Sequence, residues 1–246
     1  HFAVIGGSSS IISGNHWFQG DTLQNSPRVG GLVLTRINNR GTIDGNYIDN
    51  NFIEWVNEHD QAPEFASEFS FSQLSITDNT FIVSHVAPWF NWLVIKPMGP
   101  GHFVNGLTVT GNAFRVIGDE IDRVEKVDTS FADLDYNRFY NVTFRDNTFN
   151  NVAKPVASPV VIEHTEASPS QAWDVNAAGK LPFDAWAQVV ESVIAEGPVR
   201  NASGAVHYGA PYYLAKQGPD NDRITLRWEE PVEGTVMIKL RIDDPF

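Results

Sequence analysis

The 246-residue sequence predicts an all-β protein in which a β-solenoid over residues 1–163 precedes a small antiparallel β-domain over residues 164–246. Two observations predict this fold. A strand-like pattern recurs five times at spacings of 31 to 35 residues, and repeats of this kind stack because one copy cannot bury its own apolar face. Beyond residue 163 the repeat stops, but runs of alternating apolar and polar residues continue, which indicates further strands.

Each repeat is centred on an asparagine that follows glycine or aspartate. These residue types tolerate left-handed backbone geometry, so each pair predicts a sharp turn. An apolar residue stands three positions before each asparagine and another stands two positions after it. The asparagines are Asn15, Asn46, Asn79, Asn112 and Asn147, preceded by Ile12, Ile43, Ile76, Val109 and Phe144 and followed by Trp17, Ile48, Phe81, Phe114 and Phe149. In a stack of coils, the asparagines are expected to form an amide ladder along the axis.

The residues before each turn read as a strand with one buried face. Residues 107–110, Leu-Thr-Val-Thr, alternate with period two and are rich in β-branched types. Three further apolar runs, Leu32–Leu34, Leu93–Ile95 and Val160–Ile162, predict a second strand in several coils. The spacing around Asn79 also fits a leucine-rich repeat. That alternative is disfavoured because the period exceeds 30 residues, leucine does not dominate and no regular helix fits between copies.

The repeats resemble those of the pectate-lyase-like right-handed parallel β-helix family. The match covers about residues 8–163 and rests on units such as Leu-Thr-Val-Thr-Gly-Asn-Ala-Phe at 107–114. The segments 13–21 and 191–198 are similar to spike proteins of phage-like particles, namely gene transfer agent head spikes and prophage tailspikes. This resemblance implies a homotrimer on the surface of a virion or phage-like particle, attached to capsid or tail proteins and binding bacterial surface polysaccharide.

The final third predicts a different architecture. Residues 163–184 are rich in Ala, Pro, Ser and Asn and predict a long connection. Strands are expected at 188–194, 206–215, 223–228 and 235–242, with residues 230–234 as a hairpin loop. The segment 186–194 fits a strand, although its apolar spacing also suits a helix. This domain is expected to cap the exposed end of the solenoid or to form a trimerisation module.

Composition excludes several classes of function. The 17 Lys and Arg residues against 30 Asp and Glu residues give a net charge of −13, which repels nucleic acid. The chain has no cysteine, so disulfides and thiolate chemistry are excluded. No apolar run approaches the ~18 residues of a membrane span, and no cofactor motif or metal-ligand spacing occurs. Residue 1 is histidine and no signal peptide is visible, which indicates a fragment of a longer protein.

Carboxylates gather in two long segments between repeats. Glycoside hydrolysis needs two carboxylates about 5–10 Å apart, and Asp119 and Glu120 are the candidate catalytic pair. The alternative is that these segments are simply solvated. The first cluster contains Glu54, Glu58, Asp60, Glu64 and Glu68, and the second contains Asp119, Glu120, Asp122, Glu125, Asp128, Asp133 and Asp135.

Aromatic residues outside the repeating core positions form the candidate carbohydrate-binding site. Sugar rings pack their C–H faces on aromatic rings, while neighbouring amide and carboxylate groups bind the hydroxyls. The candidates are Trp55, Trp89, Phe90, Asn91 and Trp92, with Tyr47, Asp49, Asn50 and Asn51 nearby. Their alternative role is a local apolar cluster that fixes a long loop.

Three functions are therefore compatible with the sequence. The favoured hypothesis is a β-helical spike that binds capsular or surface polysaccharide. The second is a depolymerase of the same fold, acting as a glycoside hydrolase or a polysaccharide lyase. The third is a structural spacer that makes no contact with glycan.

Overall fold

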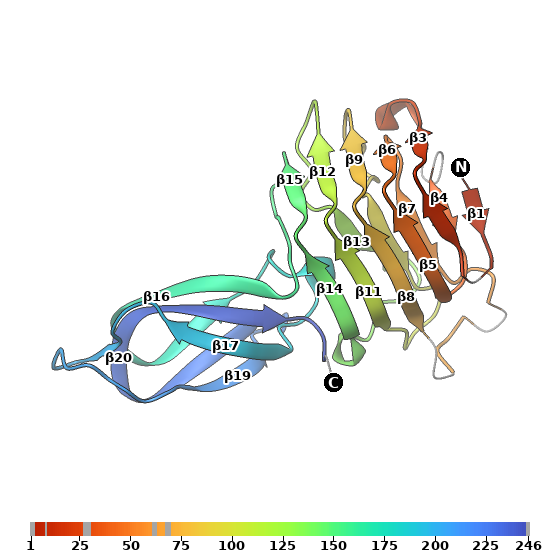
Figure 1. Cartoon of the computed structure of the whole chain (residues 1–246). Helices are drawn as coiled ribbons and strands as arrows, with labels where there is room; N and C mark the ends of the chain where they lie inside the picture. Colours follow the sequence, from red (N-terminus) through yellow and green to blue (C-terminus); the bar gives the residue numbers. More distant parts are fainter. Residues whose placement is uncertain (1–2, 8, 27–30, 61–62, 67–69, 245–246) are drawn as a thin grey trace. The chain divides into compact units, whose positions relative to one another are not determined.

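The computed structural model describes residues 3–7, 9–26, 31–60, 63–66 and 70–244, and these form two compact units (Figure 1). One unit ends at Val156 and the other spans Ala157–Asp244. The helical elements among the described residues are three short 3-10 turns, η1 (Thr22–Gln24), η2 (Tyr136–Arg138) and η3 (Pro182–Asp184). The protein is thus all-β, as the sequence predicts.

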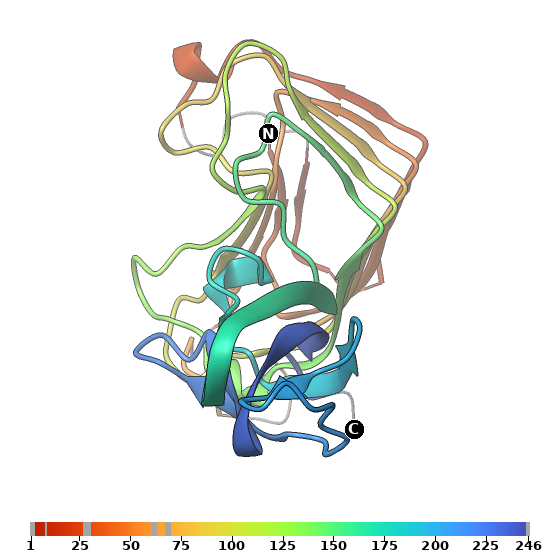
Figure 2. The ribbon, with the colours of Figure 1, turned by 90° about the vertical axis from the view of Figure 1, so that its left-hand side faces the viewer.

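The first unit is a parallel β-solenoid with three sheets of five strands each. Sheet 1 contains β1 (Ala3–Ile5), β4 (Leu32–Leu34), β7 (Ile53–Val56), β10 (Leu93–Lys96) and β13 (Glu125–Val127). Sheet 2 contains β2 (Ile11–Ser13), β5 (Asn38–Asp44), β8 (Phe71–Thr77), β11 (Val104–Thr110) and β14 (Tyr140–Arg145). Sheet 3 contains β3 (His16–Phe18), β6 (Tyr47–Asp49), β9 (Thr80–Val83), β12 (Ala113–Val116) and β15 (Thr148–Asn150). Figure 2 shows the successive coils superposed.

Each coil therefore has three strands, and the prediction of two is wrong. The missed strand is that of sheet 3, which directly follows the asparagine turn. The leucine-rich-repeat alternative is also wrong, because each coil has three strands instead of one and no α-helix occurs among the described residues.

The five asparagines form the predicted ladder. From Asn46 onward, the Oδ1 atom of each of the four asparagines accepts from the backbone N–H of the asparagine in the preceding coil at 2.9–3.0 Å. The preceding asparagine's Nδ2 donates to the same Oδ1 at 2.9–3.1 Å. The residue before each asparagine has a positive φ, and it is Gly14, Gly45, Asp78, Gly111 or Asp146. The ladder thus satisfies the buried polar groups of a turn that repeats in every coil.

The apolar residues on both sides of the ladder stack in register and fill the core. The residue two positions after each asparagine is in Cα register with its counterpart in the next coil. The rings of Phe81 and Phe114 stack with centroids 4.7 Å apart, and those of Phe114 and Phe149 with centroids 5.8 Å apart. Alternation in each strand of sheet 3 therefore leaves the residues one and three positions after each asparagine facing outward.

A buried histidine joins two segments of the solenoid wall. Burial lowers the pKa of His102, and its hydrogen bond to the Pro63 carbonyl and the nearby Asp60 charge oppose this only in part. Its Nε2 lies 2.7 Å from the Pro63 oxygen and its Nδ1 lies 3.0 Å from Ser70 Oγ. The imidazole is therefore neutral in the folded chain at neutral pH.

We expect the solenoid to lose stability as the pH falls below the ordinary histidine value of about 6.5. The unfolded chain then binds a proton at His102 that the folded chain does not bind, so the free energy of unfolding decreases with decreasing pH. Urea unfolding at pH 7.5 and pH 5 should show a smaller pH-dependent loss for His102→Gln than for the wild type. An identical loss in both proteins would contradict this role.

The second unit is an antiparallel sheet, as predicted, but two of its strands, β16 and β20, are longer than the sequence suggests. It contains β16 (Val160–Asn176), β17 (Val189–Ala195), β18 (Arg200–Asn201), β19 (Tyr212–Gln217) and β20 (Arg223–Arg241). Strand β20 pairs with each of the other four. The segment 186–194 forms a strand from Val189 onward, and the helical alternative is wrong.

Three sequence interpretations of this region are corrected. The run Val160–Ile162 is not a solenoid strand, because it begins β16 and pairs antiparallel with β20. Residues 163–176 continue β16 instead of forming a loose connection. The predicted hairpin at 230–234 lies within β20, which continues through it while the register with β16 shifts between Glu166 and Ala172.

Candidate functional site

Three of the predicted carbohydrate-binding aromatic residues lie in the solenoid core. Trp55 is 1% exposed, Phe90 3% and Trp92 0%. Trp55 donates from Nε1 to the Arg36 carbonyl at 2.8 Å. The Trp92 ring lies 5.7 Å from that of Phe90 and 5.5 Å from that of Phe114. Their ring faces are covered by protein, so in this fold they cannot stack on a sugar.

The other two candidates at this position also support the loop. Trp89 is partly exposed, and its ring contacts those of Phe52 and Phe90, each at 5.8 Å. The Asn91 amide donates to the Arg123 carbonyl at 2.9 Å. The five residues therefore form no common surface, and the contacts are those of an apolar cluster that fixes the loop 84–92.

The two acidic clusters are dispersed by the fold. Glu54 and Glu125 are buried, and Glu125 accepts from Arg123 Nε at 2.8 Å. Asp119 and Glu120 are exposed, and Asp119 Oδ2 accepts from the Val86 backbone N–H at 3.1 Å. Glu68 lies outside the described residues. Among the residues that the structure does describe, no three His, Asp or Glu side chains gather as a metal would require.

Asp119 belongs to a corner at which the loops between sheet 3 and sheet 1 meet. His85 Nδ1 lies 2.6 Å from Asp21 Oδ2, and the Leu23 backbone N–H donates to Asp21 Oδ1 at 3.0 Å. The bond from Leu23, followed by the contact with His85, lowers the pKa of Asp21. Thr22 Oγ1 donates to the His85 carbonyl at 2.6 Å. These contacts fasten the loop after β3 to the loop after β9.

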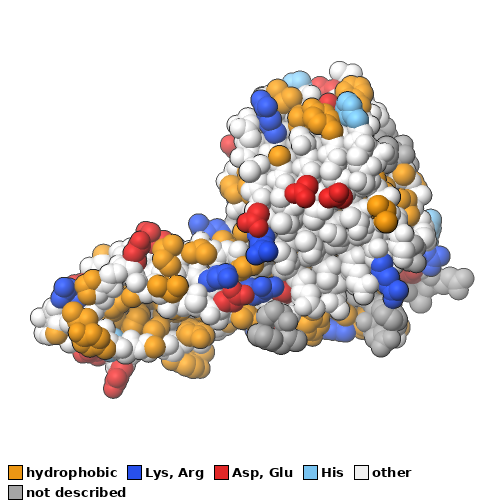
Figure 3. Space-filling model, viewed as in Figure 1, with side chains coloured by type: hydrophobic (Ala, Val, Ile, Leu, Met, Phe, Trp, Pro, Cys, Tyr) orange, Lys and Arg blue, Asp and Glu red, His pale blue; other side chains and the backbone are white. Residues whose placement is uncertain are grey.

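The outward face of sheet 3 carries a second group of exposed aromatic residues. Two rows of side chains cross its five strands. Backbone register aligns His16, Tyr47, Thr80, Ala113 and Thr148 in one row, and Phe18, Asp49, Ile82, Arg115 and Asn150 in the other. In Figure 3 hydrophobic and histidine side chains gather along the upper edge of the solenoid, over these strands.

The β3 end of this face holds four side chains, which we call the sheet-3 patch: His16, Phe18, Tyr47 and Asp49. Phe18 is 69% exposed and Tyr47 is 40% exposed. The rings of His16 and Tyr47 meet edge to face with centroids 4.9 Å apart. Aromatic rings that are fixed in place and open to water provide contact area at little entropic cost.

The only carboxyl group of the sheet-3 patch, that of Asp49, has a shifted pKa. Desolvation raises the pKa of Asp49, and the charge of the nearby His16 opposes this in part. The patch thus combines apolar ring faces with a partly desolvated acceptor. This combination suits a ligand that presents both C–H faces and hydroxyl groups.

Sequence reasoning missed Phe18 and His16 as site residues, although a signal for them is present. If the residue two positions after each asparagine points inward, those one and three positions after it point outward. Applied to Asn15 and Asn46, this alternation selects the four residues of the sheet-3 patch.

No protein-family model, no curated protein and no solved structure matches this chain. Among the described residues, no helix has the length and apolar character needed to cross a bilayer. Functional assignment therefore depends on the geometry of the solenoid.

Proposed function

We propose that this chain binds bacterial capsular or surface polysaccharide through the sheet-3 patch. The observation that carries the proposal is the pair of exposed rings, Phe18 and Tyr47, beside Asp49 on a parallel sheet. Adjacent strands of a sheet lie about 4.8 Å apart, so the two rows present a regular series of side chains to an extended polymer.

In this proposal the polysaccharide-binding chain is a spike or fibre protein on the surface of a phage-like particle. It would be a gene transfer agent head spike or a prophage tailspike. The support for this setting is the solenoid itself together with the sequence resemblance described above. In that setting the chain forms a homotrimer and attaches to capsid or tail proteins. A sedimentation mass of one chain would contradict the trimer.

Replacing both Phe18 and Tyr47 with Ala should weaken retention of purified capsular polysaccharide by at least about tenfold, because central aromatic contacts dominate binding energy. Both rings are exposed, so thermal unfolding should be almost unchanged. Ile11→Ala is the matched control, since Ile11 is 81% exposed on sheet 2, away from the patch. Equal retention by the double variant and the control would refute the proposed site.

Cleavage of the bound polysaccharide is the second candidate, and one observation favours it. The His85–Asp21 pair leaves the imidazole 46% exposed, and an imidazole beside a carboxylate is a typical acid–base group. It lies in loops that adjoin sheet 3. Incubation with capsule should yield no new reducing ends or unsaturated products if the chain only binds. If the wild type forms cleavage products and His85→Ala does not, the function is depolymerisation and not adhesion alone.

A further inference from the structure

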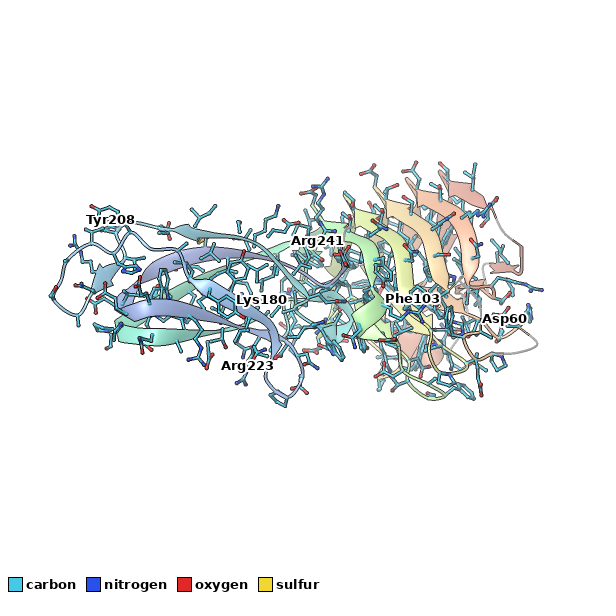
Figure 4. All side chains as sticks on the ribbon, turned by 90° about the horizontal axis from the view of Figure 1, so that it is seen from below. Asp60, Phe103, Lys180, Tyr208, Arg223 and Arg241 are labelled. Atoms are coloured by element: carbon cyan, nitrogen blue, oxygen red, sulfur yellow. The ribbon has the colours of Figure 1, made fainter. Side chains whose placement is uncertain are left out.

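The C-terminal unit contains a cavity of about 380 Å³ that is independent of the solenoid. Its walls come from β17, from β20 and from the loops at 197–199 and 206–211. Val193, Val199 and Val236 provide apolar walls, and Trp228, His207 and Tyr208 provide rings. Figure 4 shows Tyr208 near one end of this unit. This size and mainly apolar lining are typical of small-ligand sites.

The imidazole of His207 in the cavity is held in position by a carboxylate. His207 Nδ1 lies 2.9 Å from Glu230 Oε1, and the His207 side chain is only 9% exposed. Because a carboxylate only accepts, Nδ1 is the donor in this bond, and Nε2 is the ring nitrogen that is left for a ligand. No described residue forms a hydrogen bond with Nε2. A Cβ on Gly209 would lie 2.6 Å from it, so glycine leaves this atom uncovered.

The aromatic side chains of the cavity differ in how they are supported. The Trp228 ring lies 5.8 Å from that of His207 and 4.9 Å from that of Trp173 behind it. Tyr208, by contrast, is 93% exposed. Trp228 is thus a rigid wall of the cavity, and Tyr208 is an exposed ring at its edge. This arrangement suits a ring-shaped ligand that lies against Trp228 and is covered by Tyr208 on binding.

Charge limits the ligand further. No Lys or Arg is among the described residues that line the cavity, and the Glu230 carboxylate stands behind His207. An anionic ligand would therefore find no counter-charge. A purely apolar ligand would leave Nε2 of His207 unpaired, whereas a hydroxyl group, which can donate or accept, would form a hydrogen bond with it.

We propose that this cavity binds a neutral sugar ring, with its C–H face against Trp228 and Tyr208 and one hydroxyl hydrogen-bonded to His207 Nε2. The site does not depend on the sheet-3 patch, which belongs to the other unit. Binding of a single ring is expected to be weak, with a Kd of about 1–10 mM.

The test measures saturation-transfer NMR and tryptophan fluorescence with methyl glucoside and methyl galactoside as neutral probes and glucuronate as the anionic one. We expect binding of at least one neutral probe and none of glucuronate. Tyr208→Ala should weaken binding at least about tenfold, and Gly209→Ala should abolish it by covering Nε2. Tyr212→Ala is the matched control, because Tyr212 is 66% exposed but does not line the cavity.

Three results would overturn the proposal. The first is no binding of either neutral probe at about 50 mM, well above the expected Kd. The second is undiminished binding by both Tyr208→Ala and Gly209→Ala. The third is self-association that Tyr208→Ala abolishes, which would show that a second copy of the chain fills the cavity. The Phe18→Ala and Tyr47→Ala double variant should bind the probes normally, which separates this site from the sheet-3 patch.

Discussion

Replacing Asn79 with Ala should destabilise the solenoid by about 3–4 kcal/mol, because several buried polar groups lose their partners at about 1–3 kcal/mol each. The Asn79 Nδ2 atom donates to the Ile43 and Thr77 carbonyls at 2.9 Å each. Its Oδ1 accepts from both the backbone N–H and the Nδ2 of Asn46. For a chain of this size the melting temperature should fall by about 6–16 °C.

Asn15→Ala provides the matched control at the end of the same ladder. Asn15 is exposed, so water replaces the bonds that its amide makes to Ser13 and Asn46. We expect a loss below about 1 kcal/mol. The two units can unfold in separate transitions, so the solenoid transition is the one to compare. Similar losses for Asn79→Ala and Asn15→Ala would show that the ladder is not a buried structural element.

Trp92→Ala should destabilise the solenoid by about 3–5 kcal/mol, the usual cost of removing a large buried aromatic side chain. The indole is 0% exposed and its ring contacts those of Phe81, Phe90 and Phe114. Chemical denaturation measures the loss directly. The sequence-based hypothesis of a sugar-binding Trp92 requires the opposite, namely a stable variant that binds less glycan.

Trp92→Phe separates the packing contribution of the indole from its polar one. The Nε1 atom is buried and has no hydrogen-bond partner among the described residues, so its removal relieves an unsatisfied donor. We expect Trp92→Phe to cost much less than Trp92→Ala. If both variants unfold as the wild type does, Trp92 is not a core residue.

The solenoid was predictable because its signal is local and repeated. Each turn pairs a residue of positive φ, such as Gly45 or Asp78, with an asparagine whose side-chain amide bonds to the neighbouring coil. The sequence does not reveal the third strand, because strands such as His16–Phe18 are only three residues long and directly follow the turn. Short strands next to turns carry too little alternation to be recognised in isolation.

Errors elsewhere arose where long-range pairing determines structure. The segment 163–176 contains Ala, Ser and Pro and has weak strand propensity, yet it pairs with β20 along most of its length. The run Val160–Ile162 has the composition of a solenoid strand, but its pairing with β20 places it in the antiparallel sheet. Trp55 and Trp92 were expected at the surface because they lie between repeats, but their segments supply sheet 1 and the loop before it.

The most direct test of the proposed function is a structure of this chain with an oligosaccharide from a host capsule. We predict sugar rings stacked on Phe18 and Tyr47, with a hydroxyl bonded to the Asp49 carboxylate. Oligosaccharide bound elsewhere on the solenoid, with the sheet-3 patch still open to water, would contradict the proposal.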